Sequence, residues 1–190
     1  MVISKLSMPE SNNQNFNHLK IHTQYSICEG AIKIDNLKDF CKENKIPCLG
    51  LSDTSNLCGA LEFAENISKA GTQPIIGTQI NFRFEDTTGL LPLIALNEKG
   101  YKRIIELSSR SYLENDALSD PHLDIKELLS DMEGVSLLSG TIQGLFGRLF
   151  EKGRLEEITK IYRNLLPNFH DRFYLEIQRH GDQNEIAFEK

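Results

Sequence analysis

Short apolar runs and segments with helical spacing alternate along most of this chain, and this alternation limits its fold more than any other feature. Six runs are typical of β-strands, at residues 18–22, 48–52, 74–82, 91–96, 135–138 and 173–177. Most are separated by segments whose apolar residues recur every three or four positions, as in amphipathic helices. The alternation favours an α/β fold with parallel strands. A doubly wound sheet and a (β/α) barrel fit it equally well.

Helix-capping and helix-breaking residues mark where the expected helices begin and end. We place helices near residues 35–41, 56–70, 101–112, 124–134 and 155–165. Asp35 is expected to cap the first of them, and Pro167 to stop the last. Residues 1–16 are polar and are predicted to form a mobile N-terminal lead-in, so the folded domain is residues 17–190.

The charge balance argues against one class of function. Asp and Glu total 27 against 21 Lys and Arg, which gives a formal net charge of −6. Proteins that hold nucleic acid through phosphate contacts usually carry a net positive charge.

The most apolar run, residues 90–96, is far shorter than the roughly 20 residues that a membrane-spanning helix needs. The four cysteines form no C-x-x-C pair and are predicted to be reduced thiols: Cys28, Cys41, Cys48 and Cys58.

Polar side chains follow several of the predicted strands. His18, Lys20 and His22 alternate along the first strand and therefore share one face. Further polar residues in or directly after the later predicted strands and loops are Glu29, Asp53, Thr54, Gln79 and His180. Histidines and carboxylates at the mouth of an α/β fold are what a metal-dependent hydrolase requires. They are equally compatible with ordinary polar positions at strand ends, and spacing alone does not decide between the two.

A glycine-rich stretch follows the strand at 135–138. Gly140, Gly144 and Gly147 precede a helical segment, and this pattern fits either a phosphate contact or a tight turn.

Residues 18–30, HLKIHTQYSICEG, resemble the opening motif of the PHP (polymerase and histidinol phosphatase) domain. The similarity is to the form found at the N-terminus of bacterial DNA polymerase III alpha subunits, which are C-family replicative polymerases. Further similar segments follow in order at 51–59, 74–77, 97–101, 138–140 and 172–181. The resemblance implies a distorted (β/α)7, TIM-like barrel. This chain would hold about six of its strands and would be a fragment of a longer polypeptide.

The resemblance also identifies where metal ligands would lie in metal-binding members of the family. His22 matches the second histidine of the first motif, and Glu29 matches its acidic residue. Asp53 is also present, but the histidine that follows it in the family is replaced. The replaced ligands are Lys20 for His, Thr54 for His, Gln79 for Glu, Leu90 for His, and Thr141 for Cys or His. His180 is a possible pocket residue. An ammonium cannot ligate a metal while protonated, but it can partly neutralise Glu29 and Asp53. We therefore expect no catalytic residues, no metal and no cofactor in this domain.

The function implied by the resemblance is that of a structural and partner-docking module in a DNA-directed DNA polymerase, a nucleotidyltransferase. The implied partners are the rest of the alpha chain and the proofreading exonuclease subunit of the replicative holoenzyme. DNA would be bound mainly by downstream domains, whose polymerase site uses magnesium. The implied location is the bacterial cytoplasm, with the nucleoid-associated replication machinery. The alternative is an active phosphoesterase with zinc or manganese, acting as a 3′–5′ exonuclease or a histidinol-phosphatase-like enzyme.

Overall fold

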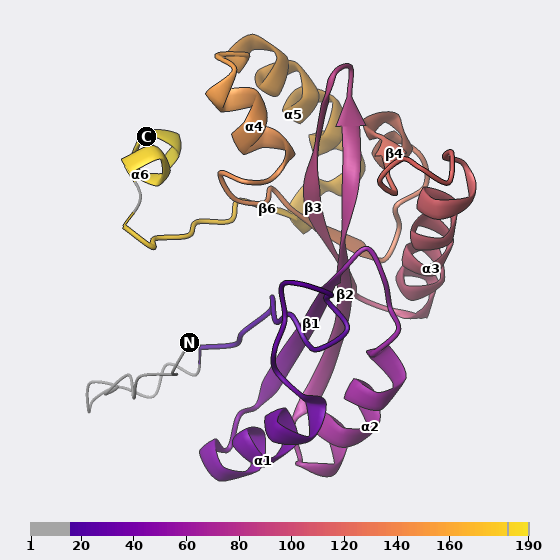
Figure 1. Cartoon of the computed structure of the whole chain (residues 1–190), viewed down its shortest axis with the longest axis vertical. Coiled ribbons are helices and arrows are strands. Elements are labelled where there is room, and N and C mark those ends of the chain that lie inside the picture. The colour runs from indigo at the N-terminus through magenta and orange to yellow at the C-terminus, as the bar shows by residue number, and fades with distance from the viewer. Residues whose placement is uncertain (1–15, 182, 190) are drawn as a thin grey trace.

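The computed structural model describes residues 16–181 and 183–189, which form a mixed α/β fold around one six-stranded sheet (Figure 1). The strands are β1 (Cys48–Thr54), β2 (Gln73–Phe84), β3 (Thr87–Ala95), β4 (Leu123–Asp124), β5 (Val135–Leu138) and β6 (Phe173–Tyr174). The α-helices are α1 (Ile34–Asn44), α2 (Ala60–Lys69), α3 (Glu98–Leu113), α4 (Leu145–Glu151), α5 (Leu155–Phe169) and α6 (Gln183–Glu189). Two 3₁₀-helices are η1 (Ile125–Leu129) and η2 (His170–Arg172). The predicted α/β class is confirmed. The predicted lead-in lies outside the described residues, apart from Phe16.

The sheet is mixed, so the expectation of parallel strands throughout is wrong. Its order is β1-β2-β3-β5-β6, and β4 pairs with β2. β1 and β2 are parallel, as are β5 and β6, but β3 runs antiparallel to both of its neighbours. Only Glu85 and Asp86 connect β2 to β3. A parallel crossover needs a dozen or more residues, so a connection this short produces a hairpin.

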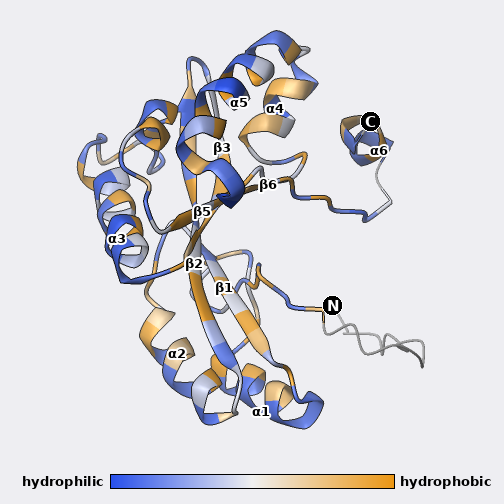
Figure 2. Ribbon diagram, turned by 180° about the vertical axis from the view of Figure 1, so that it is seen from behind, coloured by the Kyte–Doolittle hydropathy of each residue, from blue (hydrophilic) through white to orange (hydrophobic). Residues whose placement is uncertain are grey.

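The two ends of the sheet are made by short pairings. Residues 18–22 do not form a full strand, but Ile21 pairs in parallel with Leu51 of β1. At the other end the predicted strand at 173–177 is reduced to the two residues of β6. Figures 1 and 2 show the N-terminal and C-terminal segments leaving the sheet on the same side of the molecule.

Two apolar clusters form the core, one at each end of the sheet. The larger cluster joins β2, β3 and β5 to α3, α4 and α5, and α4 is strongly hydrophobic in Figure 2. The smaller cluster joins α1, α2 and β1. Leu57 packs against both clusters.

Several helix bounds differ from the sequence prediction. The helix expected near 124–134 is only the short 3₁₀-helix η1, and α2 begins at Ala60, later than expected. Pro167 lies inside α5, which continues to Phe169. Proline removes one backbone donor and crowds the preceding turn, but the helix persists to the fully buried Phe169, whose packing is a tertiary contact. Asp35 lies in the first turn of α1, where Lys33 is the N-cap residue and makes no side-chain cap. Across the described residues, no helix is both long and apolar enough to cross a membrane.

Candidate functional site

Six of the nine predicted site residues line a single polar pocket of about 340 Å³. They come from segment 18–22, the loop after it, β2, β3 and the loop after β5. These residues are Lys20, His22, Glu29, Gln79, Leu90 and Thr141. The pocket also contains Gly140 and Gly144 of the glycine-rich stretch, together with Gln143 and Gln178, which were not among the predicted site residues. Segments far apart in the sequence therefore converge where the resemblance placed the metal ligands.

A chain of hydrogen bonds crosses the pocket wall. The Gln79 side chain is 4% exposed, and its Nε2 donates to Thr54 Oγ1 at 2.7 Å. The Thr54 hydroxyl in turn donates to the Glu29 carboxylate. Three of the predicted positions are thereby connected, and they tie the loop after the first segment to the end of β1 and to β2.

Asp53 lies behind this wall and is fully buried. Its Oδ1 accepts hydrogen bonds from Thr23 N and Ser26 Oγ, both at 2.6 Å, and its Oδ2 accepts one from Thr23 Oγ1 at 2.7 Å. Thr54 N also donates to Ser26 Oγ, at 3.1 Å. Both Asp53 oxygens are therefore occupied in shaping the turn at residues 23–26.

Lys20 pairs with a carboxylate that the sequence did not indicate. Its Nζ lies 3.0 Å from Glu176 Oε1, and the two side chains are 19% and 12% exposed. We expected Lys20 to partly neutralise Glu29 and Asp53, but the ion pair that it forms in the structure is with Glu176. Glu176 stands between Leu175 and Ile177 in an apolar run, and this isolated charge is the signal that could have identified it.

His22 lies among charged groups in a partly buried position. Burial lowers its pKa below the usual 6.5, and the Lys20 ammonium adds to this effect, while Glu29 and Asp53 oppose it. Its Nδ1 atom is buried and has no hydrogen-bond partner among the described residues. Burial therefore favours the neutral form of the imidazole.

The two remaining predicted histidines lie outside the polar pocket. The His180 side chain is 73% exposed, and its Nδ1 lies 2.9 Å from Glu185 Oε1. His18 lines a separate, apolar groove, where its ring contacts Phe16 edge-on.

The glycines after β5 are accounted for by close backbone packing. Gly144 forms a bridge with Leu90, and a Cβ atom at Gly144 would lie 2.8 Å from the Leu90 carbonyl oxygen. Gly140 has a φ of 72°, a left-handed conformation that glycine adopts without strain. These contacts support the tight-turn interpretation of the glycine-rich stretch.

The donor groups of the pocket do not fit a metal cluster. Lys20 supplies a cation, Leu90 has no ligand atom, and both Asp53 oxygens are already hydrogen-bonded. Within residues 16–181 and 183–189, no three His, Cys, Asp or Glu side chains are grouped so that they could hold one metal ion.

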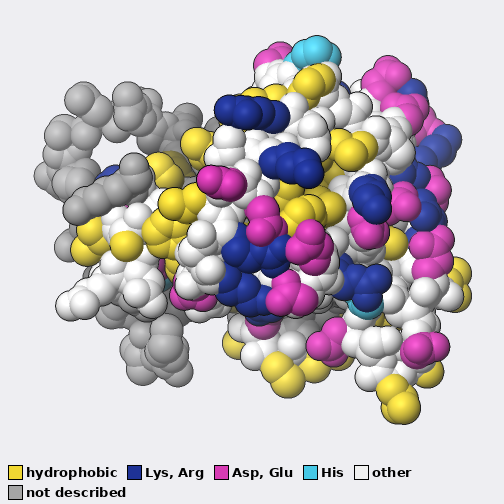
Figure 3. All heavy atoms as spheres, turned by 90° about the horizontal axis from the view of Figure 1, so that it is seen from above, with side chains coloured by type: hydrophobic (Ala, Val, Ile, Leu, Met, Phe, Trp, Pro, Cys, Tyr) yellow, Lys and Arg dark blue, Asp and Glu magenta, His cyan; other side chains and the backbone are white. Residues whose placement is uncertain are grey.

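The charge distribution near the β2–β3 turn is mixed. In the end view of Figure 3, Lys and Arg side chains are interspersed with Asp and Glu side chains. Arg154 pairs with Glu85 and with Asp86, and Lys152 also pairs with Asp86. Arg154 and Lys152 are therefore engaged with acidic neighbours.

The sequence of this chain is similar to those of known proteins. The chain is 38% identical to DNA polymerase III subunit alpha of Caulobacter vibrioides over 96% of its length, and 36% identical to that of Rickettsia felis over 92%. It spans only 17% and 14% of those relatives. A putative metal-dependent phosphoesterase from Bifidobacterium adolescentis is similar at 14% identity with a TM-score of 0.42, covering 79% of this chain and 55% of that one. Residues 18–180 match the PHP domain, and the chain belongs to this family.

Proposed function

We propose that this chain is the PHP module of a bacterial DNA polymerase III alpha subunit, and that its pocket is metal-free and serves a structural and partner-docking role. One observation carries the proposal: in a chain 32–38% identical to such subunits over most of its length, a lysine ion pair and hydrogen bonds stand where metal ligands would be. A buried or half-buried cation next to carboxylates supplies locally the positive charge that a metal would supply.

The contacts of the pocket support a structural role. The hydrogen-bond chain from Gln79 through Thr54 to Glu29 joins three segments of the chain. The Lys20–Glu176 pair joins the first and last segments of the sheet. Shared metal ligands would join the same segments, so these contacts maintain the geometry without a metal.

In this proposal, the parent protein is a DNA-directed DNA polymerase and this domain has no activity of its own. Nucleotide transfer, with its magnesium, and most DNA binding belong to other parts of the alpha chain. A net charge of −6 and a mixed surface near the β2–β3 turn are consistent with that division. The partners are the rest of the alpha chain and the proofreading exonuclease subunit, within cytoplasmic, nucleoid-associated replication machinery.

Metal analysis tests the metal-free pocket. We expect the purified chain to hold far less than one equivalent of zinc or manganese, and to melt at the same temperature with and without EDTA. We also expect no hydrolysis of phosphate monoesters or of DNA 3′ ends when either metal is added. Stoichiometric metal together with turnover that His22→Ala abolishes would establish the phosphoesterase alternative instead.

Cross-linking tests the docking role. In a complex of the full-length alpha subunit with its exonuclease subunit, we expect lysines of residues 17–190 to cross-link to the exonuclease. Cross-links from other alpha regions, with none from this domain, would rule out docking here.

A further inference from the structure

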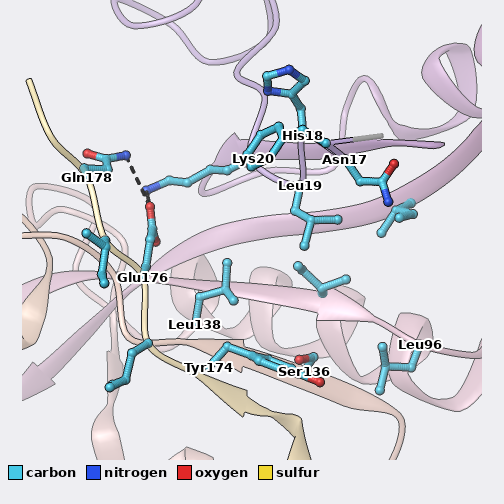
Figure 4. Close-up of a pocket in the computed structure, with 15 residues that line it drawn as sticks. Asn17, His18, Leu19, Lys20, Leu96, Ser136, Leu138, Tyr174, Glu176 and Gln178 are labelled. Atoms are coloured by element: carbon cyan, nitrogen blue, oxygen red, sulfur yellow. Dashed lines mark hydrogen bonds and ion pairs between the residues drawn. The ribbon is translucent and has the colours of Figure 1, made fainter. Parts of the chain in front are cut away.

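An apolar groove of about 630 Å³ lies between the two ends of the sheet (Figure 4). One wall includes residues 16–20, next to the pairing of Ile21 with β1, and the other includes residues 174–178, which continue from β6. Leu19, Tyr174 and Ile177 remain 38%, 55% and 61% exposed. Because these apolar side chains are only partly buried, their packing contributes less to holding the walls together than full burial would.

A single ion pair spans the groove in Figure 4, between Lys20 and Glu176. Their Nζ and Oε1 atoms are 3.0 Å apart, although the residues are 156 positions apart in the sequence. Gln178 Nε2 donates to the same carboxylate oxygen at 3.2 Å. The other oxygen, Oε2, is buried and has no hydrogen-bond partner among the described residues. The Glu176 charge therefore depends on the Lys20 ammonium for most of its compensation.

Each member of the pair is attached to a different end of the sheet. Next to Lys20, Ile21 N donates to the Gly50 carbonyl of β1 at 3.1 Å. Glu176 N donates to Ser139 Oγ at 2.9 Å, directly after β5. Because both backbones are already fixed, pairing orders few additional groups and costs little conformational entropy.

We propose that Lys20 and Glu176 form a latch, a conformational device that holds segment 16–22 against segment 173–178 and keeps the polar pocket closed on that side. Lys20 and Gln178 line both the groove and the polar pocket, so opening the latch would remove part of the pocket wall as well. This inference rests on the proposed metal-free role of the pocket, in which Lys20 supplies the fixed positive charge.

Hydrogen–deuterium exchange on the 190-residue chain tests the latch. The variants are Lys20→Met, Glu176→Gln and the charge-swapped double variant Lys20→Glu with Glu176→Lys. In both single variants we expect amides of residues 16–23 and 173–178 to exchange about tenfold faster, with α3 unchanged. The double variant is expected to return exchange toward that of the unaltered chain. Lys69→Met is the control, because it removes an exposed pair with Glu65.

Exchange within about twofold of the unaltered chain in Glu176→Gln would overturn the latch, and so would a charge swap that restores nothing. If Lys20→Met also accelerates exchange in α3, the variant has unfolded globally, and the nearly isosteric Glu176→Gln decides the question. Metal content is measured in the same samples. Stoichiometric metal in the unaltered chain would overturn the metal-free pocket, whereas the exchange rates bear on the latch alone.

Discussion

The chemical roles of Asp53 and Lys20 depend on the neighbours that the fold gives them. The Asp53 carboxylate is completely buried and accepts three hydrogen bonds from Thr23 and Ser26, so it acts as the anchor of a turn. Lys20 Nζ lies 3.0 Å from Glu176 Oε1, and the two opposite charges neutralise each other between segments 16–20 and 174–178. Both residue types suggested metal chemistry or its replacement, but in the structure both make their contacts with groups of the chain itself.

Replacing Asp53 with Asn should destabilise the chain by about 1–3 kcal/mol, because an amide nitrogen would face donors that now meet a carboxylate oxygen. Urea denaturation measures the loss, which should be the same with EDTA present. Asp39→Asn, at an exposed position on α1, is the matched control and should have little effect. Equal midpoints for the two variants would contradict the anchoring role of Asp53.

His22 makes stability depend on pH in a defined direction. Its pKa in the folded chain is lowered, chiefly by burial, from the usual 6.5. The unfolded chain therefore binds the proton more readily, and stability falls as the pH decreases through 6.5 toward the folded pKa. We expect His22→Gln to show a smaller loss of melting temperature between neutral and mildly acidic pH. The exposed His18→Gln is the control, and an unchanged slope in His22→Gln would exclude this contribution.

The start of α3 illustrates how one helix is positioned against the sheet. Asn97 is its N-cap, and the Asn97 side chain accepts a hydrogen bond from Gly100 N at 2.9 Å. Gly100 packs directly on the backbone of Gly134, which has a φ of 76° and precedes β5. Because neither Gly100 nor Gly134 has a side chain, the backbone of the first turn of α3 can pack directly against the backbone of the loop before β5.

A methyl group at Gly100 would disrupt that contact. An added Cβ atom would lie 1.8 Å from the Gly134 carbonyl oxygen, so Gly100→Ala forces the helix away from the sheet. We expect a destabilisation of about 1–3 kcal/mol from this overpacking, measured by chemical denaturation. Lys102→Ala, at an exposed position of the same helix, should be close to neutral. If Gly100→Ala is as stable as Lys102→Ala, the loop that contains Gly134 can shift to accommodate the methyl group without destabilising the chain, and the overpacking prediction is wrong.

The molecule as a whole combines two apolar cores with polar cross-links between segments of the sheet. The larger core joins α3, α4 and α5 to the sheet, and the smaller one joins α1, α2 and β1. The hydrogen-bond chain through Thr54 and the Lys20–Glu176 pair lie at the pocket and link segments from different parts of the sequence. If the chain is the proposed polymerase module, we expect these cross-links to stabilise this domain and to take no part in the polymerase reaction.

Lys20→Met in the full-length polymerase should therefore reduce heat resistance without slowing synthesis. Leaving Glu176 unpaired costs about 1–3 kcal/mol, and each kcal/mol lowers the melting temperature of a domain this size by about 2–4 °C. Primer extension at low temperature and residual activity after heating are the two measurements. A slower extension rate with unchanged heat resistance would place Lys20 in the catalytic cycle and contradict the structural role.

Much of the secondary structure could be predicted because it depends on local patterns. The runs that became β1, β2, β3 and β5 all appear in the sequence as apolar segments of the expected length. The direction of β3 was missed because it depends on whether a helix fits between the strands, and Glu85 and Asp86 leave no room for one. The extension of α5 past Pro167 was missed because the burial of Phe169 is a tertiary contact.

The sequence was sufficient to predict the α/β class, the PHP family and most of the residues around the pocket. Apolar spacing and the order of motifs can be read directly from the sequence and do not depend on tertiary contacts. It could not identify Glu176 as the partner of Lys20, or show that Asp53 is fully engaged by Thr23 and Ser26. Those pairings join residues up to 156 positions apart. Charge pairing and burial depend on distances of a few ångströms that only the folded chain sets, and so the contacts of these residues could be read only from the tertiary structure.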